Sequence, residues 1–419
     1  MYFRSTGWHF VGIPAGRSVS EEISNHKSSI HWLLTLDQKY NFPNLISKSA
    51  KIMKNSKWNF LNVISPEAFY PGISKKLSKK HSLDHLSAMI DEKIIFQEEK
   101  ESFYIYQLEK YNKSQFGIVA SIDINKKNPM ILKHEKTLEA RCDRILRTTR
   151  NTNIQVGPVY FSHKSKTNLS SIYNRYKKIK PLYNFQTSGG TIHSLWKVDN
   201  DKDIKLIEEN LKKIDKLYIA DGHHRFSSME KLYTQYGNKN KIKKCIPLLS
   251  VIFDKNNINI LSYNKVIKFK KWNYDQFILL LKKQFNKLEI SNFKQPSKRG
   301  EVSIYCNNKW HNLNIRKNNI LKKSKKTDSE IIENLVLKNI LLKKMELKIV
   351  EKTHVPGKFG AQFLEEKVDL TIADVAFFIC PMTMHEIMSV ADAGKIVPPK
   401  STFFDPKPID GLVTLLMKE

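Results

Sequence analysis

The sequence lacks an apolar run long enough to cross a bilayer, and its first residues have no continuous apolar stretch behind a basic start. Its four cysteines, Cys142, Cys245, Cys306 and Cys380, lie far apart and form no Cys-x-x-Cys pair. These absences argue against a membrane span, a signal peptide, a zinc ribbon and a disulfide scaffold. We therefore expect a soluble protein of the reducing cytoplasm.

Arginine is scarce beside lysine in a strongly basic composition. Seventy-one Lys and Arg residues stand against 41 Asp and Glu residues, for a formal net charge of +30. Such a charge raises the question of nucleic acid or an acidic membrane surface. The excess is mostly lysine interleaved with asparagine and isoleucine, as codon bias in an AT-rich genome would produce, and arginine is the better residue for phosphate and base contacts. We expect a solvated basic surface with weak, salt-sensitive binding to polyanions.

The chain has no internal repeat, and its 419 residues suffice for two or three domains. The apolar fraction of 41% and charged fraction of 27% are typical of a globular protein. The pattern predicts an irregular segment at 1–44, a core at 45–240 and a C-terminal α+β region at 241–419.

Hydrophobic periodicity predicts a mixture of strands and helices without strict alternation, so we assign an α+β fold of mixed sheets with flanking helices. Strands are expected at 102–109, 116–124, 157–163, 191–198, 215–220, 245–253 and 258–267. Helices are expected at 82–95, 136–149, 164–181, 203–214, 222–237, 276–288 and 334–345. The Lys- and Asn-rich stretch 294–330 predicts a loose peripheral patch around one strand, and the prolines of 398–408 exclude a helix.

The most specific local pattern is a strand, then Asp221-Gly222-His223-His224-Arg225, then a helix. Gly222 permits a tight or left-handed backbone, and the first amides of the following helix form an anion site. Arg225 would add a planar fork for phosphate or carboxylate oxygens, and both histidines can exchange protons near neutral pH. Asp221 could hold Mg²⁺ or accept a proton from a hydroxyl group. A purely structural interpretation, with Asp221 as a helix N-cap and the histidines as surface polar groups, stays open.

A second candidate lies between a predicted strand and a predicted helix and includes His134, Glu135, Thr137 and Arg144. It is not a zinc-protease helix, because Leu138 stands where the second histidine would be. Thr137 as an N-cap, beside a solvated charged turn, is the structural alternative.

The third candidate is Lys400-Ser401-Thr402, which is similar to the end of a Walker loop but lacks its glycine-rich lead. An extended tail held by the following two phenylalanines is the structural alternative.

Three segments together resemble the hallmark motifs of the domain-of-unknown-function family 1015, in the same order: KHEKTLEARCDR, LYIADGHHR and AGKIVPPKSTFFDPKPIDGLV. The segments WNFLNVISPE, FYIYQL and SLWKV match its intervening patterns. The resemblance covers about residues 45–419. The family carries a Pro-Tyr-Asp turn near its N-terminus, whereas this sequence has NFPNLIS, with Asn44 in place of the acid. This departure puts a role for an N-terminal carboxylate in doubt, and an eroded start is one interpretation of it.

The DGHHR corner also resembles the motif of free-serine kinases, whose core is similar to the ParB and sulfiredoxin folds. In those folds this corner receives the phosphates of a nucleotide or of pyrophosphate. Sulfiredoxin has a reactive cysteine where this sequence has His223, so thiol chemistry is not expected. The resemblance implies a phosphotransferase that uses ATP, ADP or pyrophosphate, with Mg²⁺, to phosphorylate serine or a similar small hydroxylated metabolite.

Phosphoryl transfer needs positioning and charge neutralisation more than covalent chemistry. Arg225, the helix amides and Lys400 would neutralise charge, and Asp221 or Glu135 would activate the hydroxyl group or hold the metal. His224 would contact the phosphoryl group. Two other classes stay open: a nucleic-acid-binding protein, because ParB-like cores also bind DNA, and a non-catalytic regulatory protein of the same fold.

Overall fold

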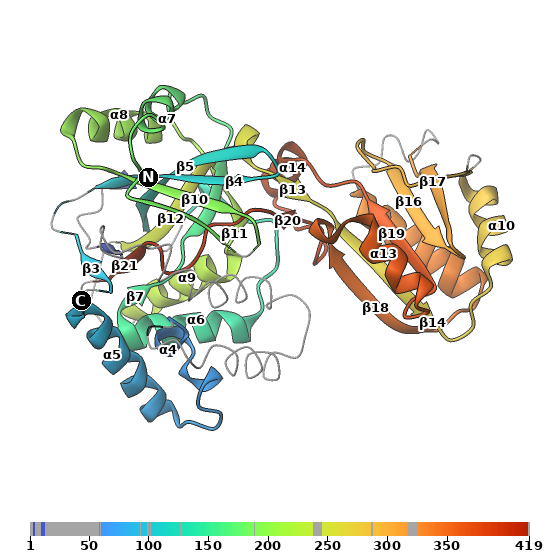
Figure 1. Cartoon of the computed structure of the whole chain (residues 1–419), viewed down its shortest axis with the longest axis horizontal. Coiled ribbons are helices and arrows are strands. Elements are labelled where there is room, and N and C mark those ends of the chain that lie inside the picture. The colour runs from blue at the N-terminus through green and yellow to red at the C-terminus, as the bar shows by residue number, and fades with distance from the viewer. Residues whose placement is uncertain are drawn as a thin grey trace. The chain divides into compact units, whose positions relative to one another are not determined.

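The computed structural model describes residues 3–4, 10–12, 58, 60–92, 94–98, 100, 102–125, 128–187, 189–237, 245–285, 288–316 and 326–417. The chain forms two compact units (Figure 1). The first comprises residues 1–258 and 406–419, and the second comprises residues 259–405. The sequence placed a boundary near residue 240, but the strand that follows it belongs to the sheet of the first unit. The last residues of the chain also return to that unit.

The first unit is built on a nine-stranded mixed sheet of order β6-β11-β8-β12-β5-β4-β10-β9, with β1 paired to β5. The pairs β11–β6 and β12–β8 are parallel, and the other pairs are antiparallel. The strands are β1 (Phe3–Arg4), β4 (Phe103–Lys110), β5 (Lys113–Ile124), β6 (Ile131–Leu132), β8 (Val159–His163), β9 (Tyr183–Gln186), β10 (Ile192–Val198), β11 (Leu217–Asp221) and β12 (Ile246–Asp254).

A small sheet of order β3-β2-β21-β7 completes the first unit. Its strands are β2 (Phe10–Gly12), β3 (Phe96–Gln97), β7 (Ile154–Gln155) and β21 (Thr414–Leu416). Because β21 pairs with both β2 and β7, it ties the end of the chain to this unit. The helices are α4 (Leu61–Ile64), η1 (Pro66–Ala68), α5 (Lys75–Asp91), α6 (Glu139–Thr152), α7 (Ser170–Tyr176), α8 (Asp201–Leu211), α9 (His223–Gly237) and η2 (Lys255–Asn257).

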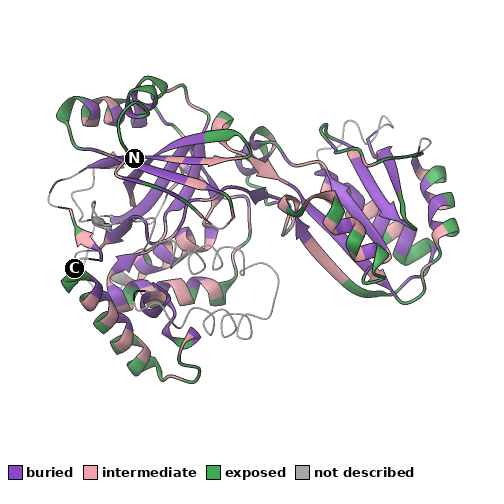
Figure 2. Ribbon diagram, viewed as in Figure 1, coloured by how far each residue is buried: buried purple, intermediate pink, exposed green. Residues whose placement is uncertain are grey.

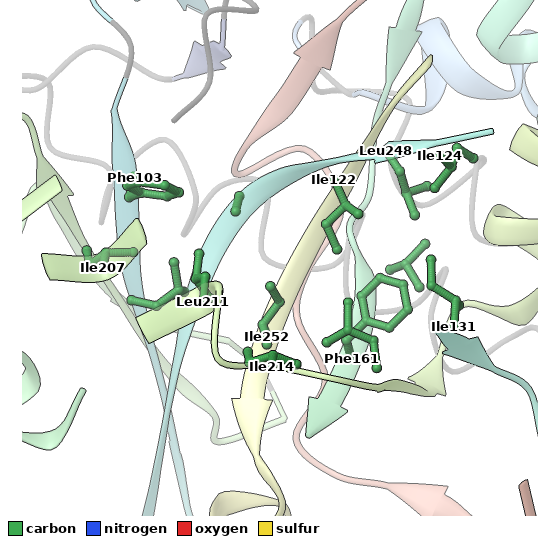
Figure 3. Packing of buried hydrophobic residues seen from close by; sticks show 14 of the residues in the cluster. Phe103, Ile122, Ile124, Ile131, Phe161, Ile207, Leu211, Ile214, Leu248 and Ile252 are labelled. Atoms are coloured by element: carbon green, nitrogen blue, oxygen red, sulfur yellow. The ribbon is translucent and has the colours of Figure 1, made fainter. Parts of the chain in front are cut away.

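The core of the first unit joins one face of the large sheet to the apolar sides of α6, α7, α8 and α9. The cluster includes the strand residues Phe103, Ile122 and Phe161 together with Ile207 and Leu211 of α8, and Phe161 lies beside Ile131 (Figure 3). The strands are buried along most of their length, whereas surface helices such as α5 expose many residues (Figure 2). Burial of both faces explains why these strands are apolar along most of their length.

The second unit is a six-stranded antiparallel sheet of order β15-β17-β16-β19-β14-β18 with helices on both faces. The helices α10 and η3 pack on one face, and α13 packs on the other. The strands of this sheet are β14 (Tyr263–Phe269), β15 (Leu288–Ser291), β16 (Glu301–Cys306), β17 (Lys309–Asn314), β18 (Ile349–Pro356) and β19 (Val375–Ile379). Two short strands, β13 (Ile260–Leu261) and β20 (Phe403–Phe404), form a separate antiparallel pair. The helices are α10 (Tyr274–Phe285), α12 (Asp328–Ile331), η3 (Ile332–Lys344), η4 (Gly357–Phe359), α13 (Gly360–Asp369) and α14 (Met384–Asp392).

The α+β class is confirmed, and most predicted strands and helices are present. The loose patch predicted for 294–330 is wrong for its described part, because β16 and β17 form a hairpin inside the sheet and their apolar residues enter both cores. The helix predicted at 164–181 is reduced to α7. The irregular segment predicted at 1–44 contains the paired strands β1 and β2, and Asn44 lies outside the described residues.

All four cysteines are free. Within the described part of the chain, no helix combines the length and the apolar character needed to traverse a bilayer.

Candidate functional site

The predicted strand–turn–helix corner is present in the first unit. Strand β11 ends at Asp221 and α9 begins at His223, so Gly222 alone makes the turn. Gly222 has a φ of +97°, and a Cβ placed on it would lie 3.3 Å from the backbone Cα of Val159. Both the positive φ and the close backbone explain why glycine is needed at this turn.

The second predicted segment lies beside this corner because β6 pairs in parallel with β11. Parallel strands end at the same sheet edge, so the chain leaving β6 meets the start of α9. The backbone amide of His134 donates to Nε2 of His223 over 3.3 Å, and the two rings meet edge to face with centroids 4.5 Å apart. Oε2 of Glu135 lies 3.8 Å from Nδ1 of His223. The structure therefore brings the two segments together, while the roles of their residues stay predictions.

The geometry assigns the tautomer of His223. Because its Nε2 accepts a hydrogen bond from the His134 amide, the proton of a neutral ring is on Nδ1, which faces Glu135. Burial holds the pKa of His223 well below its usual value, and the nearby His134 and His224 lower it further. Burial also lowers the pKa of His134 to about 4, although the charge of Asp221 opposes this. Both rings are thus neutral at pH 7, and each can donate only one N–H.

We expect the first unit to lose stability as the pH falls from about 6.5 toward 4. His134 is fully buried with a pKa of about 4 against an ordinary value of 6.5, so in this range the unfolded chain binds the proton first. Near pH 5 the difference amounts to about 2 kcal/mol for this one side chain. Hydrogen exchange of the β11 amides between pH 7 and pH 5, corrected for intrinsic rates, measures the loss. His134→Gln should make the exchange of these amides less dependent on pH. If the variant and the wild type show the same pH dependence, His134 is not the cause of the lost stability.

His224 contacts the start of α6. Its Nε2 accepts a hydrogen bond from the backbone amide of Leu138 over 3.0 Å. Leu138 occupies the N-cap position of α6 and supplies no side-chain cap. The alternative in which Thr137 caps this helix is therefore wrong, because the ring of His224 satisfies an amide at that end instead. Arg144 lies within α6 and is partly buried.

Two charged residues of the C-terminal tail pair with the corner, and sequence reasoning missed both. Nζ of Lys407 lies 2.5 Å from Oδ1 of Asp221. Arg225 donates from Nη2 to both oxygens of Asp410, over 2.9 and 3.2 Å, and from Nη1 to the carbonyl of Pro158 over 2.8 Å. The phosphate role predicted for Arg225 would therefore require Asp410 to leave. The only signal in the sequence was the order of charges. An acid precedes a base in the corner (Asp221, Arg225), and a base precedes an acid in the tail (Lys407, Asp410).

The carboxylate of Asp221 is charged at neutral pH. Burial would raise its pKa, but the positive charges of Lys407 and Arg225 outweigh this effect, and the net pKa is lowered. The Asp221 side chain retains 28% of its exposure, and that of Lys407 retains 15%. The corner therefore presents an ionised Asp–Lys pair that solvent can reach.

The third predicted candidate belongs to the second unit. Nζ of Lys400 lies 5.3 Å from the ring centroid of Tyr263, and Oγ of Ser401 donates to the carbonyl of Pro398 over 2.7 Å. Thr402 is buried. Their predicted share in the phosphate site at residues 221–225 stays a prediction.

Across the residues that the structure describes, no group of three or more His, Cys, Asp and Glu side chains is arranged to hold a metal ion. A magnesium ion that a substrate phosphate helps to bind needs only one or two protein carboxylates, and Asp221 and Glu135 are of that type.

The family described as "Protein of unknown function (DUF1015)" matches residues 45–338, and the chain belongs to this family. A comparison with curated protein sequences yields no match.

Among solved structures, the chain is similar to a free serine kinase in complex with AMP, with 14% identity, a TM-score of 0.34, and coverage of 70% of this chain and 92% of that one. It is also similar to C-terminally truncated SbnI from Staphylococcus aureus, with 12% identity, a TM-score of 0.36, and coverage of 71% and 87%. A conserved hypothetical protein from Pyrococcus furiosus gives 14% identity, a TM-score of 0.31, and coverage of 69% and 94%. Likenesses this distant do not identify an activity or a ligand.

Proposed function

We propose that this DUF1015 protein is a small-molecule phosphotransferase that moves a phosphoryl group from ATP, ADP or pyrophosphate to a hydroxylated metabolite, with free serine as the first acceptor to test. The observation that carries the proposal is the meeting of Glu135 with the start of α9, where its Oε2 lies 3.8 Å from Nδ1 of His223. This contact puts a carboxylate beside an anion-favouring helix end, next to the Asp221–Lys407 pair.

Glu135 is the better candidate for the base that accepts the hydroxyl proton. One third of its side chain is exposed, so an acceptor can reach it. Asp221 already binds Lys407, and its lowered pKa makes it a weaker base. Nδ1 of neutral His223 faces this carboxylate from 3.8 Å, so its N–H lies beside Glu135 without a direct hydrogen bond.

The positive charge for phosphate comes from Lys407 and from the helix end. The first amides of an α-helix have no partner within the helix, and those of α9 begin at His223. Lys407 adds an ammonium group at the same corner. The guanidinium group of Arg225 stays paired with Asp410 and adds positive charge to the corner. Arg225 is therefore a positioning residue in this proposal.

Magnesium fits this arrangement because Asp221 is an ionised and partly exposed carboxylate. Mg²⁺ is commonly held by one or two carboxylates together with substrate phosphates. Asp221 would hold it, and the ion would neutralise charge on the phosphates.

Donor binding tests the proposal. Calorimetry with ATP, ADP and pyrophosphate, with and without Mg²⁺, should give a saturable interaction in the full chain. Lys407→Gln should weaken it about tenfold or more, because a charge-assisted contact contributes on the order of 1.5–3 kcal/mol. The matched control is Lys231→Gln in α9, whose ammonium pairs with Glu139 and Asp143 on α6. Mass spectrometry of reactions with serine then detects phosphoserine.

Wild-type protein that is folded and binds none of the three donors would remove the phosphotransferase proposal. If Lys407→Gln and Lys231→Gln lose the same amount of donor affinity, the net charge of the surface, and not the corner, attracts the donor. Either result would favour the nucleic-acid-binding or the regulatory alternative.

A further inference from the structure

The second unit contains a small cavity that plays no part in the proposed transfer. Its volume is about 370 Å³ when the space at its opening to solvent is counted, so it suits only a small ligand. The walls come from the start of β14, the loop before β16, the start of α12, the end of β19 and helix α14. They present hydroxyl groups, two carboxylates, a guanidinium group and a thiol. Ser401 of the third sequence motif is among the lining residues.

The lining carries charge of both signs in nearly equal amounts. Nε of Arg299 lies 3.0 Å from Oε1 of Glu386, and both side chains line the cavity. The carboxylate of Asp328 lines it as well, and it accepts from Nε of Arg316 and from the backbone amide of Gly300, each over 2.6 Å. Two carboxylates are thus matched by two guanidinium groups. A small ligand with one charge of each sign would find partners for both charges here.

A ligand can reach the Arg299–Glu386 pair. The side chain of Arg299 is 45% exposed, and that of Glu386 is 25% exposed. An ion pair with this much exposure contributes little to the stability of the fold. The pair can therefore share its hydrogen bonds with a ligand at low cost to the fold.

The thiol of Cys380 reports the negative potential on one side of the cavity. Burial raises the pKa of Cys380 to about 12, and the charges of Asp328 and Glu386 add to this rise, together with that of Glu301. The thiol is therefore protonated at neutral pH and is a poor nucleophile. The potential that disfavours a thiolate would favour an ammonium group in the same place.

A buried amide group against the cavity wall has a donor without a partner. Oδ1 of Asn264 accepts from the backbone amide of Ile379 over 3.2 Å and from Oγ of Ser262 over 3.0 Å, and both of these residues line the cavity. The Ile379 bond fixes which atom of the amide is the oxygen. Asn264 is fully buried, and within the described part of the chain its Nδ2 has no hydrogen-bond partner. A ligand oxygen would remove the cost of this unsatisfied donor.

We propose that this cavity binds a free α-amino acid with a small side chain. The carboxylates of Asp328 and Glu386 accept hydrogen bonds from its ammonium group. The guanidinium group of Arg299 and Nδ2 of Asn264 donate to its carboxylate. Bonds of this kind are strong because one or both partners are charged. The site belongs to the second unit alone, so the proposal does not depend on phosphoryl transfer at the corner of the first unit.

Calorimetry of the full-length protein with glycine tests the site. Glycine has no hydroxyl group to accept a phosphate, so its binding is independent of the proposed transfer. Saturable binding is expected. Methylamine has the ammonium group of glycine without its carboxylate, and acetate has the carboxylate without the ammonium group. Each should bind about tenfold or more weakly than glycine at matched ionic strength.

Glu386→Gln should weaken glycine binding about tenfold or more, because it removes a charged acceptor from the cavity. Glutamine keeps an oxygen for the backbone amide of Thr383, which Glu386 binds over 2.9 Å in the capping box of α14. The matched control is Glu330→Gln. Glu330 has the same position in the capping box of α12 but does not line the cavity. Arg299→Gln is a second test variant, and circular dichroism checks that each variant is folded.

Three results would overturn the proposal. The first is folded wild-type protein that does not bind glycine, or that binds methylamine or acetate as tightly. The second is a loss of glycine affinity in Glu330→Gln as large as the loss in Glu386→Gln. The third is loss of glycine binding in Lys407→Gln, because that change lies in the first unit.

Discussion

Glu135→Gln is expected to lower kcat for phosphoryl transfer about 100-fold or more while leaving donor affinity nearly unchanged. Glutamine keeps the shape of the side chain but cannot accept the hydroxyl proton, and a positioned base contributes roughly 10²–10⁴ in rate. The substitution breaks no hydrogen bond to His223, whose Nδ1 is 3.8 Å away, so the local fold should persist. Single-turnover kinetics with phosphoserine detection measures the loss, and calorimetry measures donor affinity.

Glu139→Gln is the matched control for this experiment, because Glu139 is 83% exposed at the start of α6 and carries the same charge. Asp221→Asn distinguishes the role of Asp221 from that of Glu135. It should raise the KM for the donor more than it lowers kcat, because Asp221 holds Lys407 in place. The assignment of Glu135 as the base fails if Asp221→Asn abolishes turnover while Glu135→Gln remains active.

Arg225→Ala is expected to lower the free energy of unfolding of the first unit by about 3 kcal/mol. The substitution removes two hydrogen bonds to Asp410 and one to the carbonyl of Pro158, and it leaves a carboxylate with only 21% exposure without its cation. The pair also joins the tail to the corner, so hydrogen exchange should rise in both β21 and α9. Urea unfolding followed by hydrogen exchange of these two segments measures the effect.

Gly157→Ala tests the Arg225–Asp410 pair by adding a methyl group next to it. A Cβ on Gly157 would lie 1.9 Å from Oδ1 of Asp410 and 3.1 Å from Cζ of Arg225, so one partner must move. Overpacking of this kind costs about 1–3 kcal/mol, and the cost should nearly vanish in an Asp410→Ala background. If Gly157→Ala destabilises both backgrounds equally, the clash with Asp410 is not its cause.

Parts of the fold that depend on neighbouring residues were predictable. The apolar run Leu-Tyr-Ile-Ala before Asp221 predicted β11, and Gly222 predicted a turn that has a φ of +97°. The amphipathic pattern after it predicted α9. In contrast, the Lys- and Asn-rich composition of 294–330 concealed β17, although the one strand predicted there is present as β16, because the polar neighbours of β17 outnumber the alternate apolar residues that the sheet buries.

The sequence by itself determined the corner, because a strand, a glycine turn and a helix each follow from residues adjacent in the chain. It also identified His134 and Glu135 as candidates from their residue types alone. Only the tertiary structure decided which side chains complete the site. The partners Arg225 and Asp410 are separated by 185 residues, and no local periodicity encodes a contact at that distance. They meet because β21 pairs with β7 and returns the tail to the first unit, so the electrostatics of the corner depends on sheet pairing.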